Sequence, residues 1–80
     1  MLQKGVKKMT LAQLRYVITV AQLGTLSSAA KRLYISQPSL TSAIKELEKE
    51  LGITIFIRTN KGVILSRQGE EFLGYARQVI

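Results

Sequence analysis

Apolar residues recur at helical spacing in the segment that follows residue 9. Thr10 can accept a hydrogen bond from the amide three residues on, while the Gln13 side chain can reach back to the Thr10 amide, the arrangement of a capping box. Gly24 supplies a stop signal. These features predict a helix from about Leu11 to Leu23. Its apolar face consists of Leu11, Leu14, Val17, Ile18 and Ala21.

Two further helical patterns follow, separated by a tight break. Ser27 is expected to cap a short helix, and Tyr34 and Ile35 form the break after it. Ser36 is expected to cap a longer helix that ends before Gly52, with a proline in its first turn, where the amides have no intrahelical acceptor to lose. The two apolar faces consist of Ala29, Ala30 and Leu33, and of Leu40, Ala43, Ile44, Leu47 and Leu51. This order of elements is typical of a helix-turn-helix.

The pattern changes again over residues 53–65, where β-branched residues dominate. Two short extended runs flank residues 59–62 (Thr-Asn-Lys-Gly), which predicts a β-hairpin with a basic tip. Ser66 is expected to cap a last helix over residues 67–80. The apolar stripe of that helix consists of Phe72, Leu73, Ala76, Val79 and Ile80. The predicted fold is mostly α-helical with a small β-hairpin, a winged helix-turn-helix.

The chain is expected to divide into three parts. Residues 1–8 hold three lysines and no apolar period, which predicts a flexible basic arm or an added extension. Residues 9–66 are expected to form the winged helix-turn-helix domain, with the helix-turn-helix at about 26–45 and the wing at about 53–65. Residues 67–80 are expected to form a linker helix.

Two glycines lie inside the predicted last helix, at positions 69 and 74. Each costs about 1 kcal/mol relative to alanine in a helix interior. Close backbone packing at Gly69 and Gly74, for example against a partner helix, would explain why they are there.

Charge points to a polyanionic partner. Twelve lysines and arginines against five acids give a net charge of +7, which favours nucleic acid or an anionic membrane surface. Residues 52–67 contain three basic residues and no acid, whereas the longer helix of the helix-turn-helix has a slight excess of acids. Phosphate attraction is therefore expected to come from the wing and from the first two helices.

The residue inventory excludes several chemistries. The chain has no histidine and no cysteine, so it lacks the side chains for zinc sites, thiol nucleophiles, imidazole acid–base catalysis and disulfides. Its apolar runs are far shorter than the roughly 20 residues needed to span a bilayer. We therefore expect a cytoplasmic binding protein, with no enzymatic activity, no cofactor and no metal.

The outer face of the longer helix carries residue types that suit a major groove. Gln37 can offer a bidentate amide to adenine, and short hydroxyl side chains let a helix approach base edges. Arg58 and Lys61 at the hairpin would reach a flanking backbone or minor groove. Helix faces and loops that are simply exposed to solvent carry the same residue types. The helix face alone, or the hairpin alone, is therefore compatible both with DNA contact and with plain solvent exposure.

Several ordered motifs recur at the spacing of one known family. They are Leu14-Arg15-Tyr16, residues 24–33 (GTLSSAAKRL), residues 36–41 (SQPSLT), residues 44–52 (IKELEKELG) and residues 56–59 (FIRT). With them, the chain from about Met9 to Ile80 resembles the N-terminal domain of LysR-type transcriptional regulators. The resemblance implies a winged helix-turn-helix followed by a long C-terminal linker helix that pairs between subunits.

The resemblance also implies partners and site residues. The partners would be double-stranded operator DNA, a second subunit in a homodimer, a tetramer for a full-length member, and a small-molecule effector bound by a C-terminal domain absent from this sequence. Gln37, Pro38, Ser39 and Thr41 would contact bases or nearby backbone, and Lys61 would enter the minor groove. The full set expected to contact DNA is Ser28, Ser36, Gln37, Pro38, Ser39, Thr41, Ser42, Lys45, Arg58 and Lys61. The expected dimer seam is Phe72, Leu73, Ala76, Val79 and Ile80.

Three other classes of function compete with DNA binding. A winged helix can serve as a protein-interaction module, and the apolar stripe of the last helix would suit that role as well as a dimer seam. An enzyme is disfavoured because neither a phosphate-binding loop nor a dinucleotide fingerprint is present. A basic membrane-surface helix is disfavoured because the basic residues do not form a stripe opposite an apolar face.

Overall fold

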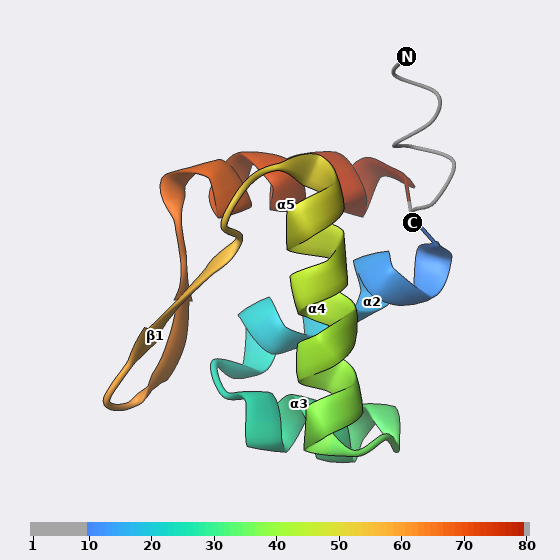
Figure 1. Cartoon of the computed structure of the whole chain (residues 1–80), viewed down its shortest axis with the longest axis vertical. Coiled ribbons are helices and arrows are strands. Elements are labelled where there is room, and N and C mark those ends of the chain that lie inside the picture. Colours follow the sequence, from blue (N-terminus) through green and yellow to red (C-terminus); the bar gives the residue numbers. More distant parts are fainter. Residues whose placement is uncertain (1–9, 80) are drawn as a thin grey trace.

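The computed structural model describes residues 10–79, which form four helices and a two-stranded antiparallel sheet (Figure 1). The predicted basic arm, residues 1–8, lies outside the described residues. The elements are α2 (Leu11–Leu23), α3 (Leu26–Leu33), α4 (Gln37–Leu51), β1 (Phe56–Thr59), β2 (Gly62–Leu65) and α5 (Arg67–Val79). The predicted class, mostly α-helical with a small β-hairpin, is confirmed.

Local capping signals set most of the helix ends. Thr10 and Gln13 form the predicted capping box at the start of α2, with the Gln13 amide donating to Thr10 Oγ1 at 3.1 Å. Ser36 caps α4 by accepting a hydrogen bond from the Ser39 amide at 3.1 Å. Gly24 and Gly52 end α2 and α4 in the left-handed conformation.

The predicted cap of α3 was wrong by two residues. Thr25, not Ser27, is the N-cap, and its Oγ1 accepts a hydrogen bond from the Ser28 amide at 3.1 Å. Thr25 has extended backbone angles directly after the left-handed Gly24, so the chain can turn into a helix at Leu26 at once. The Ser27 side chain is consequently released from the capping role and is exposed.

Tyr34 carries a conformation that tyrosine adopts rarely. Its φ of 59° lies in the left-handed region, and this turn lets the Ile35 amide donate to the Ala30 carbonyl at 3.1 Å. The side chain is 94% exposed, so packing does not compensate for the backbone cost. The break between α3 and α4 therefore contains a residue that is poorly matched to its backbone.

Replacing Tyr34 by asparagine is expected to raise the free energy of unfolding by roughly 0.5–1 kcal/mol, because asparagine tolerates the left-handed region better. Thermal unfolding followed by circular dichroism would measure the change as an increase of a few degrees in Tm. Tyr75→Asn is the matched control, since Tyr75 is 54% exposed on the helix α5, where the two residue types have similar propensities. Equal shifts in the two variants would contradict the explanation.

Two packed clusters hold the helices together, with α2 in contact with α3, α4, α5 and β2. The first cluster joins α2, α3 and α4, and the second joins α2, α4 and α5 through the connection before β1. Figure 1 shows α4 running from α3 at its first turns toward α5 near its last turns. The buried members are Val20, Ala29, Ala30, Leu40 and Ile44 in the first, and Val17, Leu47, Ile55 and Leu73 in the second.

The hairpin is shorter than its β-branched pattern suggests. Strand β1 begins at Phe56, while the preceding Ile55 is fully buried in the second cluster. Val63 ties β2 to the end of α2, because its amide donates to the Gly24 carbonyl at 2.9 Å. A side chain at Gly62 would collide with that carbonyl, so glycine is required where the hairpin passes over the turn.

The last helix is a packed part of the domain. Residues 10–79 contain no long protruding helix, and α5 lies against α2 and β2. Leu73 is 5% exposed and Ala76 is fully buried within the domain, so both side chains pack inside a single chain, and the dimer seam stays a prediction. Phe72 is half-buried against the second cluster. The side chain of Val79, and Ile80, lie outside the described residues.

Candidate nucleic-acid interface

The exposed face of α4 presents a row of mostly uncharged polar side chains. The N-terminal half of the helix contributes small and amide side chains, and one lysine follows a turn later. This row borders a shallow hollow of about 490 Å³. The lining residues are Gln37, Pro38, Thr41, Ser42 and Lys45. The structure therefore brings together five of the residues predicted for DNA contact.

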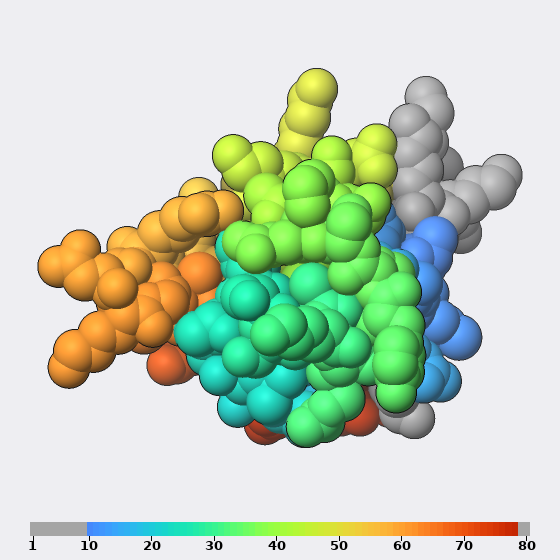
Figure 2. Space-filling view, turned by 90° about the horizontal axis from the view of Figure 1, so that it is seen from below, coloured from blue at the N-terminus to red at the C-terminus, as the bar shows by residue number. Residues whose placement is uncertain are grey.

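A second hollow, of about 320 Å³, separates α3 from the hairpin. Figure 2 shows the hairpin, in orange, standing out from the body of the domain beside α3 and α4. Gln37 lines this hollow as well as the first one, so the face of α4 and the face of the hairpin meet at that side chain. The lining residues are Thr25, Leu26, Ser27, Gln37, Arg58, Thr59, Asn60, Lys61, Gly62 and Val63.

The tip of the hairpin has a fixed local geometry. The Lys61 amide donates to Thr59 Oγ1 at 3.2 Å, and the Thr59 hydroxyl donates to the Gly62 carbonyl at 3.3 Å. Thr59 and Gly62 are the last paired residues of the two strands, which leaves Asn60 and Lys61 as the exposed loop. The cationic side chain at the tip is thus carried by an ordered turn.

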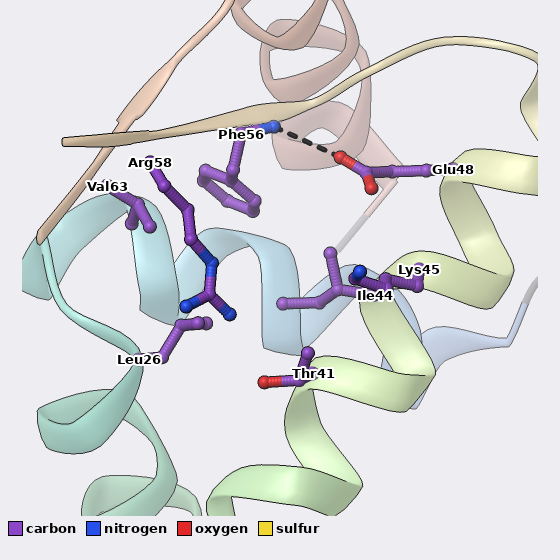
Figure 3. A pocket seen from close by; sticks show the side chains of 8 residues that line it. All are labelled: Leu26, Thr41, Ile44, Lys45, Glu48, Phe56, Arg58 and Val63. Atoms are coloured by element: carbon purple, nitrogen blue, oxygen red, sulfur yellow. Dashed lines mark hydrogen bonds between the residues drawn. The ribbon is translucent and has the colours of Figure 1, made fainter.

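Arg58 lies at the junction between the hairpin and the helix-turn-helix. It is paired with Val63 across the sheet, and Figure 3 shows its guanidinium group reaching toward Leu26 and Thr41. These residues surround a cavity of about 280 Å³. The complete lining is Leu26, Thr41, Ile44, Lys45, Glu48, Phe56, Arg58 and Val63. A cation is therefore held next to the polar face of α4.

The other residues predicted to contact DNA do not line the hollows described above. Ser36 and Ser39 are exposed at the start of α4, but the Ser36 hydroxyl caps the helix and also donates to Ser39 Oγ at 2.9 Å. Ser28 is exposed in the first turn of α3 but does not line any of the three hollows described above. Ser27, which the sequence assigned to the helix cap, lines the second hollow. The available signal was the Thr25-x-x-Ser28 spacing, which assigns the cap to Thr25 and leaves Ser27 exposed.

Metal-binding clusters and membrane-spanning helices are absent from the described part of the chain. Among residues 10–79, no cluster of three or more acidic, histidine or cysteine side chains is arranged to bind a metal ion. In the same range, every helix is too short or too polar to cross a membrane. The geometry at α4 and the hairpin is that of an exposed binding surface.

Comparison with known proteins gives a consistent answer. The family model described as "Bacterial regulatory helix-turn-helix protein, lysR family" matches residues 11–70. The transcriptional regulator ClcR of Pseudomonas putida is 47% identical over 72 residues, covering 90% of this chain and 24% of the relative. TfdT of Cupriavidus pinatubonensis is 44% identical over 72 residues, covering 90% of this chain and 32% of that protein. The chain thus spans about a quarter of the length of the first relative and about a third of the length of the second.

Solved structures are similar over nearly the same segment. The crystal structure of the CbnR_DBD-DNA complex has a TM-score of 0.85 at 41% identity, covering 89% of this chain and 82% of that one. The BenM_DBD/benA site 1 DNA complex has a TM-score of 0.84 at 37% identity, covering 89% of this chain and 83% of that one. Both proteins were crystallised with DNA.

Proposed function

This chain belongs to the lysR family of bacterial regulatory helix-turn-helix proteins, and from that premise we propose that it binds double-stranded DNA sequence-specifically within a transcriptional regulator. The observation that carries the proposal is the junction at Gln37 of two exposed faces, the polar face of α4 and the cationic face of the hairpin. The role is binding without catalysis, in the cytoplasm, where bacterial DNA lies.

We assign sequence reading to the first half of α4. Gln37 can form a bidentate pair with adenine, and Thr41 and Ser42 can donate to or accept from base edges. Pro38 and Ser39 are short enough for the helix to lie close to the bases. Ser28, Ser36 and Lys45 are assigned to the backbone on either side of the groove. The hollow along this face supports the assignment because four of its lining residues are exposed and the fifth, Thr41, is half-buried.

Phosphate attraction is assigned mainly to the wing. Arg58 and Lys61 lie on a segment that has no acidic residue from position 52 to 67. With α4 in a major groove, the hairpin beside α3 would extend to the adjacent minor groove, where a lysine at the tip can bind between the two phosphate backbones.

We also propose that the chain acts as a homodimer on DNA, reading two half-sites related by the symmetry of the protein. Because Leu73 and Ala76 are inside the domain, the proposed contact between subunits uses the outer side of α5. That side includes Phe72, which is half-buried, and Tyr75, which is exposed. From the sequence alone, we also propose Val79 and Ile80 for the contact between subunits.

Gln37→Ala and Lys61→Ala test the two assignments. Against a duplex selected from a random pool, Gln37→Ala is expected to cost roughly 1–3 kcal/mol more than against random duplex, because it removes a base contact. Lys61→Ala is expected to weaken binding to both duplexes and to lower the slope of log K against log salt by about 1. Fluorescence anisotropy at several salt concentrations measures both quantities.

Matched controls are available elsewhere on the surface. Gln68 is exposed on α5, and Lys49 lies beside Gln13 and Glu50 in the last turn of α4, one turn beyond Lys45 and three turns from Gln37. Gln68→Ala and Lys49→Ala should therefore change binding much less than Gln37→Ala and Lys61→Ala. Equal losses of Gln37→Ala on both duplexes would remove Gln37 from base reading. A wild-type chain with no salt-sensitive binding to any duplex would overturn the proposal and favour a protein-interaction module.

A further inference from the structure

Glu48 connects α4 to the hairpin through both its backbone and its side chain. Its carbonyl oxygen accepts hydrogen bonds from the Gly52 amide at 2.8 Å and the Ile53 amide at 3.2 Å. Its carboxylate Oε2 accepts from the Ile55 amide at 2.7 Å and from the Phe56 amide at 3.2 Å, the second of which is drawn in Figure 3. One residue of α4 therefore holds four amides of the connection, up to the first residue of β1.

The position of Glu48 on the helix relates this attachment to the exposed face. Thr41 and Lys45 precede Glu48 by seven and three residues, so the three side chains lie on one side of α4, and all of them line the cavity that contains Arg58. The start of β1 is thus hydrogen-bonded to the same side of α4 that bears the proposed DNA-contacting residues. The angle between helix and hairpin is defined at this point.

The hairpin needs such a fixed base. A two-stranded sheet alone is marginally stable in water. From Phe56 to Thr59 the strand extends about 10 Å, so a small rotation at Phe56 displaces the tip by ångströms. Strand β2 is held separately, by the Val63 amide on the Gly24 carbonyl at 2.9 Å, and the Ser66 amide on the Ile55 carbonyl, also at 2.9 Å, joins the two ends of the hairpin. The carboxylate of Glu48 supplies the attachment on the β1 side.

We propose that Glu48 is a positioning residue for DNA binding: its carboxylate holds β1 at the angle that brings Arg58 and Lys61 to the DNA that α4 occupies. The inference rests on the proposed function. It assigns to an acidic residue of α4 a role that favours binding to a polyanion.

The sign of the effect separates this role from simple electrostatics. Removing a negative charge near Arg58 and Lys45 should strengthen attraction to phosphate if charge alone matters. If Glu48 positions the wing, its removal should weaken binding instead. Glutamine keeps the length and one acceptor oxygen without the charge, so Glu48→Gln should bind DNA better than Glu48→Ala and less tightly than the wild type.

The experiment compares Glu48→Gln and Glu48→Ala with Glu46→Gln and Glu46→Ala, in which the same charge is lost from an exposed position of α4. The probes are the selected duplex and a random duplex, titrated at several salt concentrations. Glu48→Ala is expected to bind the selected duplex roughly three- to tenfold more weakly than the wild type. The slope of log K against log salt should fall by about 1, the change expected for the loss of one phosphate contact. The Glu46 variants should bind as tightly as the wild type or more tightly.

A double-mutant cycle with Lys61→Ala shows whether the wing is the route of the effect. When β1 is already displaced by Glu48→Ala, adding Lys61→Ala should change affinity and slope little. If the losses of binding free energy in the two single variants add up fully in the double variant, the inference is overturned. Circular dichroism verifies folding, and Glu48→Gln carries the test alone if Glu48→Ala does not fold.

The remaining outcomes separate the two proposals. If Lys61→Ala weakens binding while the Glu48 variants match or exceed the wild type, the positioning role is wrong and the proposed DNA binding stands. If the wild-type chain shows no salt-sensitive duplex binding, both proposals are wrong.

Discussion

Gly69→Ala is expected to lower the free energy of unfolding by roughly 2 kcal/mol or more, one of the two largest effects we predict for a single substitution in this chain. A Cβ at Gly69 would lie 3.0 Å from the Ile55 carbonyl carbon and would overlap the oxygen bonded to it. Both are backbone atoms, so they cannot move aside as the end of a flexible side chain could. Thermal unfolding should show the loss as a decrease in Tm of roughly 10 °C.

The Ile55 carbonyl cannot shift easily because its surroundings are bonded on every side. It accepts the Ser66 amide, the Ile55 amide is held by Glu48, and the Ile55 side chain is buried. The Gly69 amide itself donates to Ser66 Oγ at 2.8 Å, which fixes the first turn of α5 against this segment. The added methyl group must therefore separate α5 from the base of the wing.

Gly74→Ala is the matched control on the same helix. A Cβ at Gly74 would have no neighbour within 4 Å, and the residue is exposed. Alanine should therefore stabilise α5 by up to about 1 kcal/mol through its better helix propensity. The two substitutions should move Tm in opposite directions, and a Gly69→Ala chain as stable as the wild type would contradict the close approach.

The sequence and the structure agree best where a feature depends on neighbouring residues. The capping box at Thr10, the cap at Ser36 and the stop at Gly52 were all predicted, because each depends on residues within one helical turn. The cap of α3 failed for a related reason. Thr25 and Ser27 are both good caps, and the left-handed Gly24 decides between them.

The features that depend on distant residues were not predictable in the same way. The periodicity of α5 marks Leu73 as apolar but does not show whether its neighbour is Val17 of the same chain or a second subunit. The close packing expected at Gly69 is confirmed, yet its partner is the chain's own Ile55 carbonyl. The close packing expected at Gly74 is wrong, because a Cβ there would have no neighbour within 4 Å. The late start of β1 likewise reflects the side chain of Glu48, seven residues before Ile55.

The residues assigned to DNA contact also combine features that depend on neighbouring residues with features that depend on distant ones. The sequence indicated the face of α4 and the basic hairpin as separate features, each of which was compatible with plain solvation. The structure joins them at Gln37, which borders both hollows. That adjacency depends on how the hairpin is anchored to the turn after α2, a contact between residues 24 and 63 with no local sequence signal.

Leu40→Ala is expected to cost about 2–5 kcal/mol, the usual range for truncating a buried leucine, because the lost contacts and the cavity left behind both destabilise the fold. Leu40 is fully buried among Val20, Ala29 and Ile44, where α2, α3 and α4 meet. A domain of this size has a total stability of roughly 4–12 kcal/mol, so the substitution removes a large share of it. Urea unfolding would measure the loss as a lower midpoint with little change in slope.

The position of Leu40 makes its truncation a functional test as well. Leu40 is in the first turn of α4, between Gln37 and Thr41, and it is the buried contact that holds that turn against α3. Leu40→Ala should therefore weaken binding to the selected duplex even at temperatures where the chain is still folded, because the turn that carries Gln37 loses its support. Leu11→Ala is the control, since Leu11 is 57% exposed and its truncation should change stability by about 0.5 kcal/mol or less. Equal losses of stability in the two variants would contradict the placement of Leu40 in the core.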